Sequence, residues 1–263
     1  MGPYSVAPPQ LVGLTLPADP ATSGSAVVLE ADVYYPRGEG PFPVLLMRQP
    51  YGRAIASTVV YAHPRWYASH GYIVVIQDVR GRGTSTGEFD LFRNETEDGY
   101  ATVLWAANLP GSNGMVGMYG FSYQGMTQLY AASQRPAPLK TIIPAMVGYH
   151  LYQDWAYENG ALLLQLGLAW ALQLAADTAR RHQDRSAYQR LYRAAHHLPL
   201  DSPTPACPPL LQELAPDSFF HDWLRHPQDD AYWESLRPDL SQVDLPMLHM
   251  GGWADPYLRG DLR

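Results

Sequence analysis

Short apolar runs recur along residues 26–146 and alternate with segments of helical character. The strand-like runs lie at 27–35, 44–47, 72–76, 115–119 and 141–146, and helices are expected around 66–70, 98–108 and 126–132. The run at 72–76 is apolar throughout, which is typical of a strand buried on both faces of a parallel sheet. Strands that alternate with helices predict a doubly wound, mostly parallel α/β sheet.

The first two runs are joined by a short Gly/Pro turn, so we expect 27–35 and 44–47 to form an antiparallel pair. Residues 1–23 are rich in Pro, Gly and Ala and are expected to form a loose arm. Together these patterns predict that the first part of the sheet domain spans 24–149.

The pattern changes after residue 150, where no convincing strand follows until the apolar segment 245–250. Alanine, leucine, glutamine and arginine dominate 161–195, apart from a break near 182–185, and a proline-rich loop follows at 199–209. This composition predicts an all-helical cap at 150–238, inserted into the sheet domain. The sheet domain then resumes at 239–263.

Composition narrows the class of protein. The chain has 263 residues, 46% of them hydrophobic, which suits one domain with a sizeable insertion. Its formal net charge of −7 argues against a nucleic-acid partner, and no apolar run approaches the roughly 18 residues that cross a membrane. One cysteine, Cys207, excludes an internal disulfide and suits a reducing compartment, so we expect a cytoplasmic protein without metal or cofactor. The oligomeric state is not indicated.

The most informative motif is the run from Gly120 to Gly125, which directly follows the apolar segment 115–119. A strand, a sharp turn that presents Ser122 and then a helix form the nucleophile elbow of serine hydrolases. Small residues are needed where the chain segments nearly touch, and the two glycines meet that need. Gln124 stands where the common Gly-x-Ser-x-Gly pattern has its second glycine. A serine in an ordinary strand-to-helix turn is therefore the alternative.

A candidate for the acid of a catalytic triad follows the last apolar run. Asp255 ends the segment Gly251–Asp255, just past 245–250, and α/β-hydrolases place Ser, Asp and His in that order along the chain. Outside this context Asp255 would be an ordinary loop aspartate.

Several motifs together resemble the cocaine esterase / X-prolyl dipeptidyl-peptidase (CocE/NonD) family of serine hydrolases. They lie at 77–85 (QDVRGRGTS), 97–100 (EDGY), 113–123 (NGMVGMYGFSY), 48–51 (RQPY) and 226–233 (HPQDDAYW). The likeness runs from about residue 24 to the end, and the family form of the elbow, Gly-x-Ser-Tyr-x-Gly, accounts for Gln124. The resemblance implies an α/β-hydrolase with an inserted helical cap. On this resemblance, the family's last strand or strands and its C-terminal β-sandwich domain are expected to be missing from these 263 residues.

The resemblance also implies roles for individual residues. Ser122 would be the nucleophile and Asp255 the triad acid. The backbone N–H of Tyr123 and the phenol of Tyr51 would form the oxyanion hole.

The acyl pocket would include Trp155, Trp170 and Tyr257. The α-amino-acid ester hydrolases of the family carry acidic residues two and three positions after the triad aspartate, where this chain has Tyr257 and Leu258. The substrate class expected is a small ester or amide, or a short peptide, with a neutral and aromatic acyl group.

The triad base is the missing part. All nine histidines precede Asp255, and His249, the nearest, is expected to pack against the sheet within a strand. We therefore expect a serine hydrolase truncated before its histidine and nearly inactive alone, with the base supplied by a missing C-terminal segment or in trans. The strand at Met247 would then have an open edge.

Two other classes compete with a hydrolase. One is a non-catalytic α/β-hydrolase-fold protein that binds a ligand or a partner chain, against which the joint presence of Ser122, Tyr51 and Asp255 argues. The other is a nucleotide-dependent reductase, suggested by the glycines at 81, 83 and 87 after a buried strand. Their spacing is not Gly-x-Gly-x-x-Gly, and Glu88 and Asp90 place negative charge where a phosphate would lie.

Overall fold

The computed structural model describes residues 2–17, 26–55, 61–198 and 205–262. The chain divides into two compact units, which are treated separately below. The first unit comprises Met1–Val147 and Pro238–Arg263, and the second comprises Gly148–Arg237.

The first unit is built on a sheet with the strand order β2-β3-β6-β5-β7-β8. The strands are β2 (Gln10–Leu16), β3 (Val27–Tyr34), β5 (Phe42–Gln49), β6 (Ile73–Asp78), β7 (Ser112–Phe121) and β8 (Leu139–Ala145). The four strands from β6 to β8 are parallel, whereas β2 and β3 run antiparallel to their neighbours. The predicted doubly wound, mostly parallel sheet is confirmed. Two short strands, β1 (Ser5–Val6) and β4 (Pro36–Arg37), pair separately.

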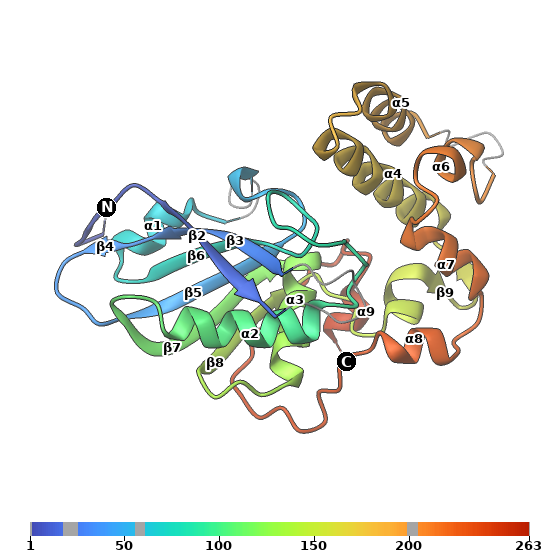
Figure 1. Ribbon diagram of the computed structural model, residues 1–263. Coiled ribbons are helices and arrows are strands. Elements are labelled where there is room, and N and C mark those ends of the chain that lie inside the picture. The colour runs from blue at the N-terminus through green and yellow to red at the C-terminus, as the bar shows by residue number, and fades with distance from the viewer. Residues whose placement is uncertain (1, 18–25, 56–60, 199–204, 263) are drawn as a thin grey trace. The chain divides into compact units, whose positions relative to one another are not determined.

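Helices cover both faces of this sheet. They are α1 (Pro64–Ser69), α2 (Glu95–Ala107) and α3 (Tyr123–Ser133), and Figure 1 shows α2 and α3 together in front of the strands. In β6, Ile76 packs in a cluster with Ala68 of α1, while Gln77 accepts a hydrogen bond from Thr102 of α2. Consecutive strand residues point to opposite faces, so α1 and α2 lie on opposite sides.

The predicted antiparallel pair of 27–35 with 44–47 is wrong, because β6 lies between β3 and β5. The chain leaves β5, passes through α1 and returns as a parallel strand beside β5, and this crossover fills the position next to β3. The turn residues between the two runs thus correctly separated the two strands, but they did not show which strands pair in the sheet.

The predicted loose arm at 1–23 is wrong for residues 10–16. These residues form β2, which pairs with β3 from Gln10↔Val33 to Leu16↔Val27. Alternate side chains of β2 turn toward the core, and Leu16 packs with Val27 and Leu29. Residues 18–23 of the predicted arm lie outside the described residues.

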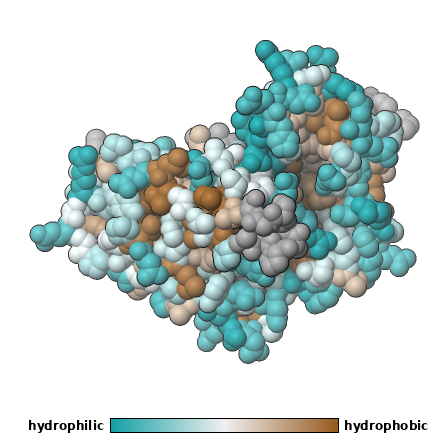
Figure 2. Space-filling view, in the orientation of Figure 1, coloured by the Kyte–Doolittle hydropathy of each residue, from teal (hydrophilic) through white to brown (hydrophobic). Residues whose placement is uncertain are grey.

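The segment 245–250 rejoins the sheet as predicted, alongside β8, although it is not a regular strand. Isolated parallel bridges join Ile142 to Met247 and Ala145 to Met250. Large apolar side chains within and just after this segment are exposed. They are Leu248, Met250 and Trp253, the last of which is 98% exposed. Figure 2 shows that brown, apolar groups also reach the surface elsewhere, among hydrophilic ones.

The second unit is mainly helical. It holds the π-helical turn η2 (Leu151–Ala156), the strands β9 (Tyr157–Glu158) and β10 (Ala161–Leu162), and the helices α4 (Leu164–Arg181), α5 (Arg185–His196), α6 (Pro209–Leu214), α7 (Phe219–Arg225) and α8 (Ala231–Ser235). The cap is therefore not all-helical, because β9 and β10 form a small hairpin. Asn159 and Gly160 both have positive φ at its turn, so the Asn-Gly pair is the signal that was missed.

Residues 199–204 of the predicted proline-rich loop lie outside the described residues. Within the described part of the chain, no helix combines the length and the apolar character needed to cross a membrane.

Candidate active site

Ser122 lies at the turn between β7 and α3 in a strained backbone conformation. Its φ of 57° and ψ of −125° lie outside the regions that residues with a Cβ commonly adopt. Its N–H donates to Ala145 O at 2.8 Å, and its side chain does not cap the helix that follows. The helix begins at Tyr123, earlier than the predicted start at 126, so Ser122 is the residue that immediately precedes it.

Steric contacts explain the two glycines of the elbow. A Cβ on Gly120, whose φ is +143°, would lie 2.4 Å from Gln124 Cβ. A Cβ on Gly125 would lie 2.3 Å from Val147 Cγ1 and 3.0 Å from Ala145 O. The distances of 2.4 and 2.3 Å are shorter than real Cβ contacts allow. Glycine is therefore needed at position 125, against Val147, while Gln124 packs on the other glycine, Gly120.

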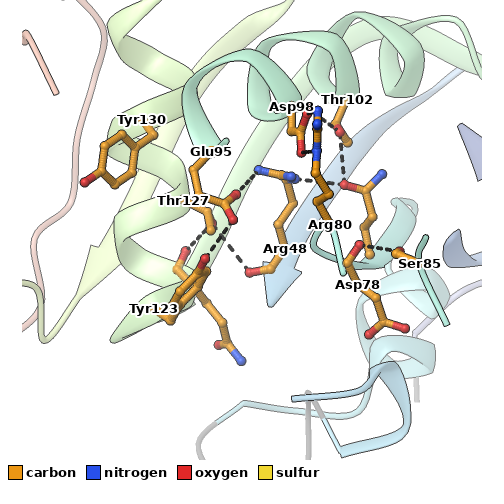
Figure 3. A network of polar contacts seen from close by, with 12 residues as sticks. Arg48, Asp78, Arg80, Ser85, Glu95, Asp98, Thr102, Tyr123, Thr127 and Tyr130 are labelled. Carbon is orange, nitrogen blue, oxygen red and sulfur yellow. Dashed lines mark hydrogen bonds and ion pairs between the residues drawn. The ribbon is translucent and has the colours of Figure 1, made fainter. Parts of the chain in front are cut away.

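Beneath the elbow, the side chain of Tyr123 is anchored in a buried polar network (Figure 3). Its phenol donates to Glu95 Oε1 at 2.7 Å, and Glu95 Oε2 pairs with Arg48 Nη1 at 2.5 Å. Arg48 Nε donates in turn to Gln77 Oε1 at 2.8 Å. Burial raises the pKa of the Glu95 carboxyl, and the Arg48 charge opposes that rise.

This network makes Glu95→Ala a strongly destabilising change. The Arg48 guanidinium, which is fully buried, would lose its counter-charge and the Tyr123 phenol would lose its acceptor. Breaking a buried ion pair from one side costs about 3–5 kcal/mol, so we expect a loss of that size in the free energy of unfolding by urea. Asp90→Ala is the control, since its pair with Arg93 is exposed and such pairs contribute roughly 0–1 kcal/mol. Equal losses in the two variants would contradict this prediction.

Asp255 lies in the turn after 245–250, and its carboxyl is buried. Its Oδ1 accepts from the N–H of Tyr257 at 2.9 Å, while its Oδ2 has no hydrogen-bond donor among the described residues. Asp261, in the short helix α9 (Leu258–Asp261), faces it. Burial raises the pKa of Asp261 to about 6, and the Asp255 charge adds to the rise.

Tyr51 and Tyr257 lie near this acid. Burial raises the pKa of Tyr257, and the charges of Tyr51 and Asp255 contribute further. Tyr51 follows the carboxyl end of β5, as Ser122 follows that of β7. Since the carboxyl ends of parallel strands meet at one edge of the sheet, the fold gathers Tyr51, Ser122 and Asp255 at that edge.

None of the three histidines that the structure describes in the first unit bonds directly to Asp255. His63 Nδ1 accepts from the N–H of Arg65, and His70 Nδ1 lies 2.6 Å from Trp66 O. His249 Nδ1 lies 3.8 Å from Asp261 Oδ1. Within the described residues of this unit, no hydrogen bond or ion pair joins a histidine to Asp255.

The predicted placement of His249 within a regular strand is wrong. Its segment makes only isolated bridges, and its side chain is 36% exposed. Pro246 offers no N–H to β8, which helps to keep this segment irregular.

Trp155 and Trp170, two of the residues expected in the acyl pocket, lie in the second unit. Their ring centroids are 5.4 Å apart, and Trp155 Nε1 donates to Gly148 O at 2.9 Å. Tyr257, the third, belongs to the first unit and is 9% exposed.

The glycine-rich loop after β6 makes no nucleotide site of the usual kind. After β6 ends at Asp78, the loop pairs with β3 through the N–H of Thr86, which donates to Val28 O. The helix that follows begins only at Glu95. The described residues include no cluster of His, Cys, Asp or Glu that could hold a metal ion.

Comparison with known proteins gives consistent matches. The profile of the X-Pro dipeptidyl-peptidase (S15) family matches residues 23–263. Cocaine esterase from Rhodococcus sp. (strain MB1 Bresler) is 33% identical over 249 residues, which cover 90% of this chain and 43% of the esterase. A CocE/NonD family hydrolase from Staphylococcus aureus superposes with a TM-score of 0.69 at 23% identity, covering 98% of this chain and 43% of that one. An aminopeptidase from a Thaumarchaeota archaeon superposes with a TM-score of 0.68 at 22% identity, covering 97% of this chain and 46% of that one. The chain thus spans less than half the length of these relatives.

Proposed function

Since this chain belongs to the X-Pro dipeptidyl-peptidase (S15) family of serine hydrolases, we propose that it contributes the nucleophile and the oxyanion hole of an enzyme that cleaves ester or amide bonds through an acyl-enzyme on Ser122. The observation that carries the proposal is the strained turn at Ser122, with φ of 57° between β7 and α3. Such strain persists where the surrounding structure fixes it, and it clusters at functional sites.

In the proposed reaction, Ser122 Oγ attacks the carbonyl carbon of the substrate and its proton passes to a histidine. The carbonyl oxygen becomes an oxyanion, which accepts hydrogen bonds from the backbone N–H of Tyr123 and the phenol of Tyr51. Collapse of this intermediate expels the alcohol or amine, which takes the proton from the histidine. Water then releases the acyl group from Ser122 by the same steps.

Asp255 is the proposed partner of the histidine. Its buried Oδ2, without a donor among the described residues, is an acceptor suited to an imidazole N–H. We propose that the histidine comes from outside these 263 residues, because all nine histidines precede Asp255, whereas α/β-hydrolases place the base after the acid. Without that base, a comparable triad loses on the order of 10⁶ in kcat.

We propose a neutral, aromatic acyl group for the substrate. Tyr257 and Leu258 follow Asp255 where an ammonium-binding site would carry carboxylates. Tyr257, buried beside Asp255 in the first unit, is proposed to contact the acyl group. Within the family, this choice favours an ester or amide of an aromatic acid over an α-amino-acid ester.

A fluorophosphonate probe tests the proposal, since it phosphonylates an activated serine. We expect slow labelling of the 263-residue chain, fast labelling when the chain is expressed with the residues encoded after Arg263, and none in Ser122→Ala of either form. Turnover of p-nitrophenyl benzoate should follow the same order. Fast labelling of the 263-residue chain would show that a base lies within it. Absence of labelling in both forms would instead favour a non-catalytic binding protein.

A further inference from the structure

Asp78, which the proposed reaction does not use, lies buried at the carboxyl end of β6. It stands in register with Gln49 of β5, and its side chain is 2% exposed. Three donors meet its carboxylate. Gln49 Nε2 donates to Oδ1 at 3.2 Å, while Arg53 Nη1 and the N–H of Thr84 donate to Oδ2 at 2.5 and 3.2 Å.

These donors hold the segment that carries Tyr51 at both of its ends. On the near side, the N–H of Tyr51 donates to Gln49 Oε1 at 3.1 Å, and the same amide group binds Asp78. On the far side, Arg53 binds Asp78 directly. Between them Gly52 has φ of +96°, which turns the chain back toward the carboxylate. One carboxylate thus closes the loop from Gln49 to Arg53.

The surroundings of Asp78 are built for an ionised group at this point. A Cβ on Gly83 would lie 2.0 Å from Asp78 Oδ2, so only glycine leaves room for the carboxylate. Arg53 also pairs with Asp32 on β3 at 3.1 Å, which fixes the guanidinium from a second strand. Burying a carboxylate is costly unless it is paired. Here two of the groups that pair with Asp78 belong to the loop 49–53.

We propose that Asp78 is a positioning residue, which holds the Tyr51 phenol in place for the oxyanion by binding both ends of the segment Gln49–Arg53. This inference rests on the proposed role of Tyr51 as an oxyanion donor. An oxyanion hole works because its donors are oriented before charge develops, so a loosened loop weakens the donor even when the phenol is intact.

A double-mutant cycle tests this coupling. It uses the active form of the protein, by which we mean the chain expressed with the residues encoded after Arg263. We expect Tyr51→Phe to lower kcat about 10²–10³-fold, as loss of one oxyanion donor does. Asp78→Asn removes the charge that binds Arg53 and should lower kcat by about 10-fold or more, whereas in the Tyr51→Phe background it should have little further effect. Multiplicative losses from the two changes would overturn the proposal.

Asp98→Asn is the matched control, because Asp98 is also buried and receives two bonds from Arg80, at 3.0 and 2.6 Å. Any loss of kcat that it causes should persist in full in the Tyr51→Phe background. Non-additivity of Asp98→Asn equal to that of Asp78→Asn would mean general destabilisation and would overturn the proposal.

Amide hydrogen exchange gives a readout that does not need activity. In the 263-residue chain, Asp78→Asn should speed exchange in peptides that contain residues 50–54, and Asp98→Asn should not. Unchanged exchange in Asp78→Asn overturns the anchoring whatever the enzyme does. Faster exchange together with a Tyr51→Phe variant of normal kcat would support the anchor, and the oxyanion role of Tyr51 would then be what fails.

The pH dependence provides a further check. The ratio of the kcat of the wild type to that of Tyr51→Phe cancels the histidine, which both proteins share. Burial raises the pKa of Asp78 to about 6, against the charge of Arg53 and with that of Asp32. Thr84 and Gln49 contribute only neutral donors. We expect this ratio to keep its full value above about pH 7 and to fall by about 10-fold or more below about pH 6 as Asp78 is protonated, the same factor that Asp78→Asn removes. A constant ratio would contradict the proposal.

Discussion

Replacing Ser122 by alanine is expected to remove essentially all hydrolysis by the active form of the protein. Loss of the serine from a comparable triad costs on the order of 10⁶ in kcat and leaves roughly 10³–10⁴ over the uncatalysed rate in water. The reason is that the acyl-enzyme can no longer form, while binding and the oxyanion donors remain. Initial rates with p-nitrophenyl benzoate at saturating concentration measure the effect.

The structure separates this loss from misfolding. Alanine keeps the Cβ of Ser122 and removes a hydroxyl that does not cap α3, so the urea midpoint should be unchanged. Ser133→Ala is the control at the other end of the same helix, where the hydroxyl donates to Tyr130 O and has no proposed catalytic role. A Ser122→Ala variant that kept more than a tenth of the wild-type kcat would refute Ser122 as the nucleophile.

The strand-to-helix turn at Ser122 could be predicted because its sequence requirements are local. Gly120 is needed by its contact with Gln124, four residues further on, and a run of apolar residues precedes the turn, whereas the contact of Gly125 with Val147 forms only when β8 is in place. The buried strands were predictable for a similar reason. Continuous apolar runs between helical segments have few other uses in an α/β fold.

Strand neighbours and polar networks could not be predicted, because they depend on residues distant in sequence. Nothing within 27–47 shows that β6 will separate β3 from β5. Likewise, Glu95 reads as the acidic first turn of a helix, and only the fold brings it to Arg48 and Tyr123. The strand β2 was missed for another reason: proline and glycine dominate 1–23 and conceal the alternation within 10–16.

Asp255→Asn is expected to lower kcat about 10⁴-fold in the active form, since the neutral amide no longer holds the histidine in its productive tautomer. The same change should stabilise the fold near pH 7.5. Asp261, which faces Asp255, has a pKa raised to about 6, in part by the Asp255 charge. A carboxyl whose pKa is raised by folding contributes stability that is present below about pH 4 and is lost as the pH rises through about 6. Burial is the larger cause of the raised pKa, and removing the Asp255 charge takes away the smaller part of that loss.

Asp261→Asn distinguishes the triad acid from its neighbour. It also relieves the repulsion between the two carboxylates, and it leaves the Asp255 charge available to the histidine. We expect it to raise the urea midpoint at pH 7.5, as Asp255→Asn does, while kcat stays within about 10-fold of the wild type. An equal collapse of kcat in both variants would make the pair, rather than Asp255 alone, the catalytic acid. Asp255→Asn should therefore raise the stability and lower the rate. Such opposed changes are expected when a carboxylate that orients the catalytic histidine stays ionised next to a second carboxyl group.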